Sequence, residues 1–229
     1  MVESNIRWAI RRIAEIIKNP TKRRDIYMTL EWKAGYMEDT FIKQDYAWLA
    51  ERLKPNSVVL DLGGAIGDSA VYFAGFENVS KVISLEPVPK VYAIGKKMVA
   101  ESPRRVRNKI RFENCAISDK EGIKAIDGWL GWAFSTRKDK QRGVSVRQHT
   151  LDSITKDITN PIAIKCDIEG DERIIFNDAD LSKVYVIELE HHWNCKELMK
   201  SILKDKGFKT KDLTPMNDMG CALMGAWRE

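Results

Sequence analysis

The sequence lacks both a long apolar segment and paired cysteines. No apolar run approaches the roughly 20 residues that a membrane-spanning helix needs. Arginines interrupt the apolar residues of segment 6–18, which makes it unlike the core of a signal peptide. The four cysteines are scattered, without the spacing of a zinc site or a redox dithiol. We therefore expect no transmembrane segment, free thiols and a cytoplasmic protein.

Histidine is also scarce, and neither sign of charge dominates. The chain has 229 residues, of which three are histidines, 44% are hydrophobic and 31% are charged, as is typical of soluble globular proteins. The net charge of +5 permits a phosphorylated or nucleic-acid partner without requiring one. A chain of this length can bury a sizeable core, so its stability requires no disulfide or structural metal.

The hydrophobic pattern changes near residue 45. Isoleucines at helical spacing predict an amphipathic helix over 5–18, and we interpret residues 1–45 as a helical appendage. Over residues 46–229 strands alternate with helices, and several strands are continuous apolar runs, as in sheets covered on both faces. We therefore predict one α/β domain with an open, mostly parallel sheet and helices on both faces. The expected strands are 57–62, 81–86, 109–117, 162–169, 183–190 and 221–228, and the expected helices are about 43–53, 68–76, 90–101 and 195–207.

The segment VVLDLGGAIGDSA, residues 58–70, forms the predicted turn between the first strand and the next helix. Gly63, Gly64 and Gly67 allow a tight turn and let a ligand touch the backbone. The free N–H groups at the start of the helix would suit a carboxylate or a phosphate. We therefore expect these three glycines to line a ligand site at the carboxyl ends of the strands.

The residues around this turn distinguish between ligands. A triphosphate loop needs Lys-Ser/Thr after the last glycine, where Asp68 and Ser69 stand, and a dinucleotide fingerprint needs glycine in place of Leu62. Asp61 brings a negative charge to the site, which disfavours a pyrophosphate and suits an ammonium or a sulfonium. S-Adenosylmethionine carries both of these cations, so we expect it to be the ligand.

The next two strand ends agree with a nucleoside ligand. Glu86 lies 19 residues after Gly67 at the end of a strand, where its carboxylate could accept hydrogen bonds from both ribose hydroxyls. Pro87 follows it, and Cys115 and Ala116, at the end of the third strand, are expected to border the adenine through backbone groups and apolar contact.

A cluster of acids follows the fourth strand. Lys165, Asp167 and Glu169 alternate and should point to one side. Carboxylates crowded together need a cation, which could be Lys165, the sulfonium or a metal. We assign no metal ligand at this stage.

Methylation of a hydroxyl needs a general base near neutral pKa. His191 and His192 end the fifth strand at the same edge, and strand alternation lets only one of them face the cleft. We favour His191, because its side would be opposite that of Glu190.

The motifs VVLDLGGAIGDSAVYFA, VISLEPVPKVY, NCAISDKEG, HTLDSI, IKCDIEGDE and VIELEHH follow the order seen in FkbM-type S-adenosylmethionine-dependent methyltransferases, and the chain resembles that family over about residues 56–195. The resemblance implies a class I methyltransferase fold, Rossmann-like with an antiparallel last strand, and O-methylation of a sugar, lipid or small metabolite. It also implies that Asp167 lies nearest the methionine end of the cofactor, and Glu169 could position the acceptor or a metal. The family turn reads G-A-N-x-G, whereas Ala65 provides no side-chain amide here.

Three other functions compete with this interpretation. An RNA methyltransferase could use the basic runs 102–111 and 137–142, with Trp129, Trp132 and Phe134 stacking on a base or a sugar. A nicotinamide-dependent oxidoreductase is disfavoured by the missing first glycine. A non-catalytic, nucleotide-binding relative is disfavoured by the acids at three strand ends. We favour a small-molecule or glycan acceptor over nucleic acid, and we expect that the chain could form a homodimer.

Overall fold

The computed structural model describes residues 11, 35–127, 143–218 and 220–229. The predicted helix over 5–18, the aromatic segment 129–134 and the basic run 137–142 lie outside these residues. Within the described ranges, no helix is both long enough and apolar enough to cross a lipid bilayer.

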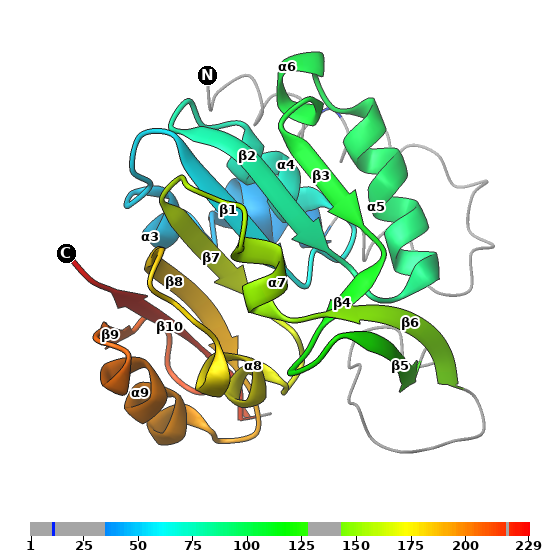
Figure 1. The fold of residues 1–229 in the computed structure, drawn as a ribbon. Coiled ribbons are helices and arrows are strands. Elements are labelled where there is room, and N and C mark those ends of the chain that lie inside the picture. The colour runs from blue at the N-terminus through cyan, green and yellow to red at the C-terminus, as the bar shows by residue number, and fades with distance from the viewer. Residues whose placement is uncertain (1–10, 12–34, 128–142, 219) are drawn as a thin grey trace.

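A seven-stranded sheet with the order β3-β2-β1-β7-β8-β10-β9 forms the centre of the molecule (Figure 1). Strands β3, β2, β1, β7 and β8 run parallel, and β10 pairs antiparallel with both β8 and β9. The predicted open, mostly parallel sheet with an antiparallel last strand is therefore confirmed. The bounds are β1 Ser57–Leu62, β2 Val79–Leu85, β3 Ile110–Glu113, β7 Ile162–Cys166, β8 Val184–His191, β9 Lys209–Asp212 and β10 Ala222–Trp227.

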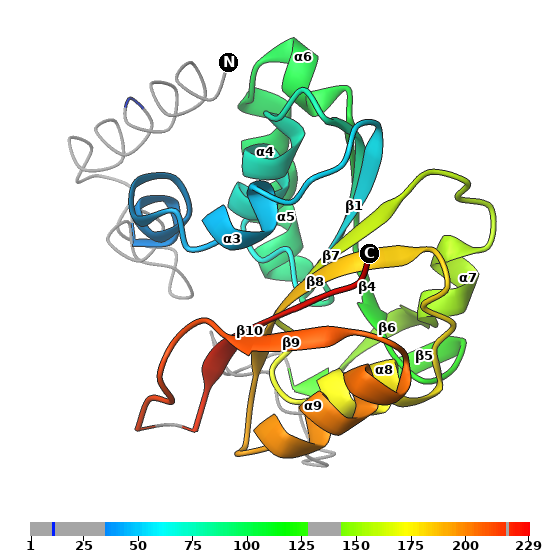
Figure 2. The same cartoon turned by 90° about the vertical axis from the view of Figure 1, so that its left-hand side faces the viewer.

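Helices cover both faces of this sheet, as the continuous apolar strands predict. Every residue of β1 and β7 is buried. Helices α3, α4 and α5 lie on one side and α7, α8 and α9 on the other (Figure 2), and each side encloses its own apolar cluster. The helices are η2 Asp39–Lys43, α3 Ala47–Ala50, α4 Asp68–Ala74, α5 Pro89–Glu101, α6 Arg104–Arg107, α7 Leu151–Thr155, α8 Glu172–Asp178 and α9 Lys196–Asp205.

A second sheet, with the order β4-β6-β5, lies beyond the carboxyl end of β3 (Figure 1). It contains β4 Cys115–Ile117, β5 Gly122–Asp127 and β6 Gly143–His149. The prediction of a single strand over 109–117 is wrong, because the chain leaves the large sheet at Asn114. The Asn114 side-chain amide donates hydrogen bonds to the carbonyls of Glu86 and Pro87, 2.9 Å each, and so redirects the chain into the second sheet.

Part of the segment before residue 45 packs against the large sheet. Met37 and Phe41 are fully buried in the same apolar cluster as α4. The Phe41 ring meets Tyr72 edge-on, with 5.7 Å between ring centroids. The predicted division of the chain at residue 45 stays a prediction.

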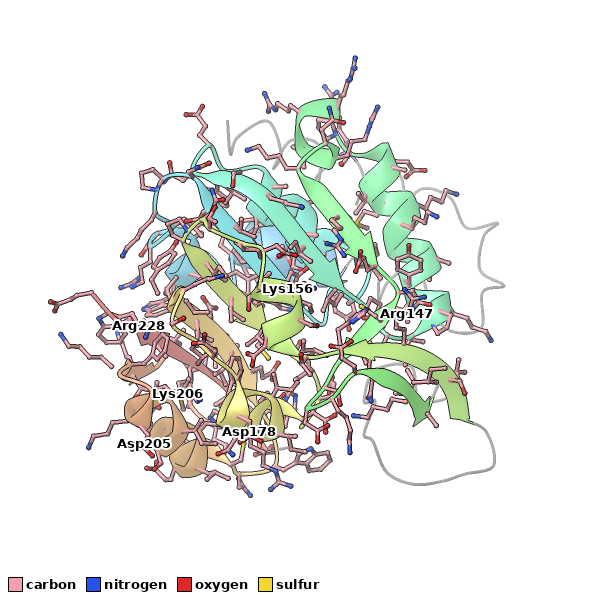
Figure 3. The ribbon with its side chains drawn as sticks, in the orientation of Figure 1. Arg147, Lys156, Asp178, Asp205, Lys206 and Arg228 are labelled. Atoms are coloured by element: carbon pink, nitrogen blue, oxygen red, sulfur yellow. The ribbon has the colours of Figure 1, made fainter. Side chains whose placement is uncertain are left out.

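Two basic side chains fix the connection between α8 and β8. Figure 3 shows Lys206, which follows α9, and Arg228, which follows β10, on the left of the view. Lys206 Nζ donates to the carbonyl of Ala179 at 2.8 Å, and Arg228 donates to the carbonyls of Val184 and Leu181. The two cations thus add hydrogen bonds to the carbonyls of this connection, one of which also accepts the N–H of Val184, and they anchor the start of β8.

Glu188, in the middle of β8, is an acid buried inside the fold. Its Oε2 accepts the N–H of Leu49 at 2.8 Å, and its Oε1 has no hydrogen-bond partner within the described residues. The pKa of Glu188 is raised to about 8. Burial is the main cause and the charge of Asp45 adds to it, whereas the Leu49 hydrogen bond and the charges of Lys165 and Arg52 oppose the rise. The folded protein thus holds a proton that the unfolded chain releases at its ordinary pKa of 4.5.

Because Glu188 holds this proton in the folded state, the free energy of unfolding should depend on pH. The folded state binds more protons than the unfolded state between about pH 4.5 and pH 8, so stability falls as pH rises through that window. Glu188→Gln keeps an acceptor for Leu49 but carries no charge. We expect the free energy of unfolding of the variant, relative to that of the parent, to rise by at least about 1 kcal/mol from pH 5 to pH 9, since one pKa unit corresponds to about 1.4 kcal/mol. Urea denaturation at both pH values measures this difference. The exposed-site control Glu197→Gln should gain nothing, and a difference independent of pH for Glu188→Gln would contradict the prediction.

Candidate functional site

A pocket lies where the carboxyl ends of β1, β2 and β7 meet. Its wall combines the turn after β1, the end of β2, the residues after β7, and strands β4 and β5 of the second sheet. Tyr36 and Tyr46 add aromatic surface from the segment before β1. The pocket thus occupies the edge of the sheet at which open α/β proteins bind ligands.

The glycine turn after β1 is held close to its neighbouring strands. The N–H groups of Gly63 and Gly64 donate to the carbonyl of Leu85 at 3.1 and 2.8 Å, which ties the turn to β2. Gly63 has a φ of +80°, and a Cβ at this position would lie 1.8 Å from the carbonyl oxygen of Asp167. A Cβ on Gly64 would lie 2.1 Å from Ser84 Oγ. Gly63 is required by the close approach of the backbone after β7, and Gly64 by the side chains of Ser84 and Phe112. Among Gly63, Gly64 and Gly67, Gly63 alone lines the pocket.

Asp61 and Lys165 form a buried pair behind the turn. Asp61 is fully buried, and its Oδ2 accepts hydrogen bonds from Ser69 Oγ at 2.9 Å and Ser84 Oγ at 2.6 Å. Lys165 Nζ lies 3.4 Å from Asp61 Oδ1 and donates to the carbonyl of Gly63 at 2.6 Å. Asp61 does not line the pocket, so its carboxylate supports the turn from below, whereas Lys165 reaches the pocket wall.

Glu86 is the acid that reaches the pocket from β2. It is 5% exposed, and its two oxygens accept the N–H groups of Ala65 at 3.0 Å and Val88 at 2.7 Å. Burial raises the pKa of Glu86 to about 8, against the opposing effect of these two hydrogen bonds. The departure at Ala65 removes a side-chain amide from the turn but leaves the backbone N–H that holds Glu86 in place.

The wall beside Glu86 is apolar. Pro87, Cys115 and Ala116 line the pocket as predicted, together with Val91 and Ile126. Cys115 and Ala116 are buried, at 2% and 7% exposure. The pocket therefore offers an apolar wall next to the Glu86 carboxylate. This combination suits adenosine, whose flat base is joined to a ribose with two hydroxyl groups.

The acids after β7 meet a histidine after β8. Asp167 and Glu169 line the pocket, and His192 Nε2 lies 3.9 Å from Asp167 Oδ1 and 3.4 Å from Glu169 Oε2. His192 Nδ1 is 2.8 Å from Glu172 Oε1. Burial alone would lower the pKa of His192, but the hydrogen bond to Glu172 and the nearby carboxylates raise it to about 9.

His192, and not the predicted His191, therefore faces the acids. His191 is buried at 1% exposure and is not part of the pocket lining. Burial lowers the pKa of His191. The preference for His191 relied on Glu190 pointing away from the cleft, whereas Glu190 and His192 share one side, with ligand atoms within 4.8 Å of each other.

Other pocket residues gave no signal in the sequence. Tyr36, Tyr46, Lys124 and Asp68 line the pocket, and they come from segments far apart in the chain. Lys124 Nζ lies 2.5 Å from Asp171 Oδ2, which closes the rim between β5 and the residues after β7. Only the strand-to-helix position of Asp68 could have indicated a pocket residue in advance.

The charged groups that line the pocket distinguish between a pyrophosphate ligand and S-adenosylmethionine. Carboxylates from Asp68, Glu86, Asp167, Glu169 and Asp171 line the pocket, against the cations of Lys124 and Lys165. Both of these cations already face carboxylates. A pyrophosphate would meet net negative charge here, whereas an adenosine carrying an ammonium and a sulfonium finds acceptors and counter-charges. The donor set therefore fits S-adenosylmethionine and does not fit a dinucleotide.

Comparison with known proteins gives the class of the chain. Residues 61–210 match the family model described as the methyltransferase FkbM domain. The protein belongs to the FkbM methyltransferase family, which confirms the resemblance seen in the sequence. No curated protein matches the chain in sequence.

Solved structures resemble the chain in fold. A precorrin-6y C5,15-methyltransferase from Geobacter metallireducens is 12% identical with a TM-score of 0.50, over 81% of this chain and 89% of that one. An rRNA methylase from Streptococcus thermophilus is 11% identical with a TM-score of 0.50, over 82% of this chain and 95% of that one. At this identity the likeness establishes the class I methyltransferase fold, Rossmann-like as predicted.

The close approach of Gly63 to β7 predicts how the turn responds to a methyl group. Gly63→Ala must move the Asp167 carbonyl, whereas Gly207→Ala has a similar φ of +84° with nothing within 4 Å of its Cβ. We expect Gly207→Ala to lose about 1 kcal/mol of unfolding free energy from left-handed strain. Gly63→Ala should lose at least about 1 kcal/mol more, because an added methyl group also overpacks its surroundings. Urea denaturation measures both losses, and equal losses would contradict the packing role of Gly63.

Proposed function

We propose that this methyltransferase uses S-adenosylmethionine to methylate a hydroxyl group of a sugar, a lipid or a small metabolite. The observation that carries the proposal is the pocket itself, in which Glu86 from β2 and Asp167 after β7 face a common cavity beside an apolar slot. Family membership supports the reaction class, since the chain matches the FkbM domain over residues 61–210.

Each part of the pocket has a proposed role. Glu86 accepts the ribose hydroxyls, while Cys115 and Ala116 border the adenine. Asp167 faces the amino end of the methionine portion, and Asp61 acts indirectly by holding the turn that carries Gly63. When bound, S-adenosylmethionine supplies the methyl group from a sulfonium, and the enzyme must hold the acceptor oxygen in line with it.

The acceptor hydroxyl is best accommodated at the edge formed by Asp167 and Glu169. This edge opens into the pocket and carries the carboxylates that can receive a hydrogen bond from a hydroxyl. His192, and not His191, stands next to these carboxylates, with its Nε2 3.4 Å from Glu169 Oε2 and 3.9 Å from Asp167 Oδ1. The proton of the acceptor therefore has to leave through the group of Asp167, Glu169 and His192.

The location of the basic run 102–111 argues against its use in binding RNA at the pocket. Arg104, Arg105 and Arg107 lie on α6, which precedes the amino end of β3, so they are at the opposite edge of the sheet from the pocket (Figure 1). Arg107 donates to the carbonyl of Ser102 at 3.0 Å, and Arg111 pairs with Glu113. These residues form no described path of positive charge toward the pocket.

Cofactor capture can be tested at Glu86. Hydrogen bonds to a charged group contribute about 1.5–3 kcal/mol, so at pH 9, above the pKa of about 8, Glu86→Gln should weaken binding of S-adenosylhomocysteine about tenfold to a hundredfold. Isothermal titration calorimetry measures the affinity, and thermal unfolding checks that the variant is folded. Glu197→Gln, on the exposed surface of α9, is the matched control. Unchanged affinity in a folded Glu86→Gln would refute the proposed role of this carboxylate.

The acceptor class can be tested by methyl transfer. We expect radioactive methyl groups from labelled S-adenosylmethionine to appear on hydroxyls of a panel of sugars, lipid headgroups and small metabolites, and not on bulk RNA. Mass spectrometry of the product should show an added methyl group on oxygen. Transfer to RNA, with an affinity that falls steeply with salt, would replace the proposed acceptor class with nucleic acid.

A further inference from the structure

Three side chains from two strand ends converge on one point of the pocket edge. Asp167 and Glu169 follow β7 and His192 follows β8, and one potential ligand atom from each lies within 4.8 Å of the other two. Two carboxylates and an imidazole are a donor set that divalent transition metals accept. Clustered acids are common on protein surfaces, so the orientation of His192 has to decide whether the cluster is a site.

The imidazole of His192 is fixed from behind by a buried carboxylate. Its side chain is 6% exposed, and its Nδ1 lies 2.8 Å from Oε1 of Glu172, whose side chain is fully buried. Glu172 Oε1 in turn accepts the N–H of Gly170 at 3.0 Å. This contact fixes the ring so that Nε2 points to the other side, toward Asp167 and Glu169. This is the arrangement by which proteins orient metal-binding histidines.

The side of His192 opposite Glu172 faces two carboxylates. Nε2 lies 3.4 Å from Glu169 Oε2 and 3.9 Å from Asp167 Oδ1. Asp167 Oδ1 is buried and has no hydrogen-bond partner within the described ranges. Two atoms that each lie about 2.1 Å from an ion are roughly 3–4 Å apart at ordinary coordination angles. Both distances to Nε2 fall in this range, and all three ligand atoms lie within 4.8 Å of one another, so their spacing is compatible with an ion between them.

Electrostatics favours the same conclusion. Glu172 and Glu190 add their carboxylates to those of Asp167 and Glu169 around one histidine. The nearest lysine of β7, Lys165, is engaged by the Gly63 carbonyl and Asp61. Acids grouped in this way repel one another, and a divalent cation offers a stronger counter-charge than the single positive charge of His192.

We propose that Asp167, Glu169 and His192 bind a divalent cation, with the remaining coordination positions open to the pocket. Because an imidazole is a better ligand for Mn²⁺ or Zn²⁺ than for Mg²⁺, the site belongs to the transition-metal class. A second group, Glu190, His192 and Cys221, also brings its ligand atoms within 4.8 Å. Asp167 and Glu169 line the pocket, whereas no member of the second group does, so only the first group would place an ion against the pocket.

The cation would also make the acceptor hydroxyl easier to deprotonate, and this consequence rests on the proposed function. A hydroxyl at an open coordination position loses its proton to solvent more readily. Such a site would remove the need for a free histidine base. The ion site itself depends only on the three ligands and on Glu172.

The test uses the full chain, freed of metal by a chelator and titrated with Mn²⁺ in the absence of any cofactor. We expect one bound Mn²⁺ per chain, seen as loss of the free-ion signal in electron paramagnetic resonance, together with a raised Tm. Asp167→Asn, Glu169→Gln and His192→Gln should each weaken binding about tenfold or more. His149→Gln and Glu197→Gln, which change a histidine and an acid elsewhere on the surface, should not.

Three outcomes would overturn the assignment. One is no Mn²⁺ bound at millimolar concentration, the second is binding unaffected by the ligand variants, and the third is binding lost in Cys221→Ser but kept in Glu169→Gln. If His192→Gln fails to fold, the partly exposed Glu169→Gln still decides the question. Because no cofactor is present, Mn²⁺ binding by a protein that methylates nothing would retain the ion site and refute the proposed function.

Discussion

The arrangement of the pocket depends on the ammonium group of Lys165. It lies beneath the turn after β1, donates to the Gly63 carbonyl at 2.6 Å and stands 3.4 Å from Asp61. Its side chain is 3% exposed. Burial alone would lower its pKa, but Tyr46, Asp61 and Asp167 raise the pKa well above its usual range. A buried cation of this kind persists only with its partners in place, so it ties β7 to the turn that forms the pocket floor.

Much of the fold follows from local patterns in the sequence. The mostly apolar runs at 57–62 and 183–190 became β1 and β8 almost residue for residue, because strands buried on both faces are dominated by apolar residues, with Asp61 and Glu188 as the buried exceptions. The second sheet could not be anticipated in the same way. Its origin is the pair of hydrogen bonds from Asn114 to the carbonyls of Glu86 and Pro87, and these depend on residues that meet only after folding.

The candidate site was predictable where a residue follows a strand directly. Glu86, Asp167 and Glu169 reached the pocket for this reason. The role of Asp61 differed, because the side chain of a residue within a strand points into a layer of the fold and here meets two serines. The choice between His191 and His192 depended on the direction of one peptide at the end of β8, which composition and spacing do not determine.

The contact between Gly63 and the Asp167 carbonyl has a consequence for how such enzymes diversify. A Cβ on Gly63 would stand 1.8 Å from that carbonyl, so the backbones of two walls of the cavity are locked together. The remaining walls are built by Tyr36, Lys124 and Ile126, which lie outside the large sheet. Homologues that have acquired new acceptors should therefore have varied these outer walls, while the inner backbone was preserved.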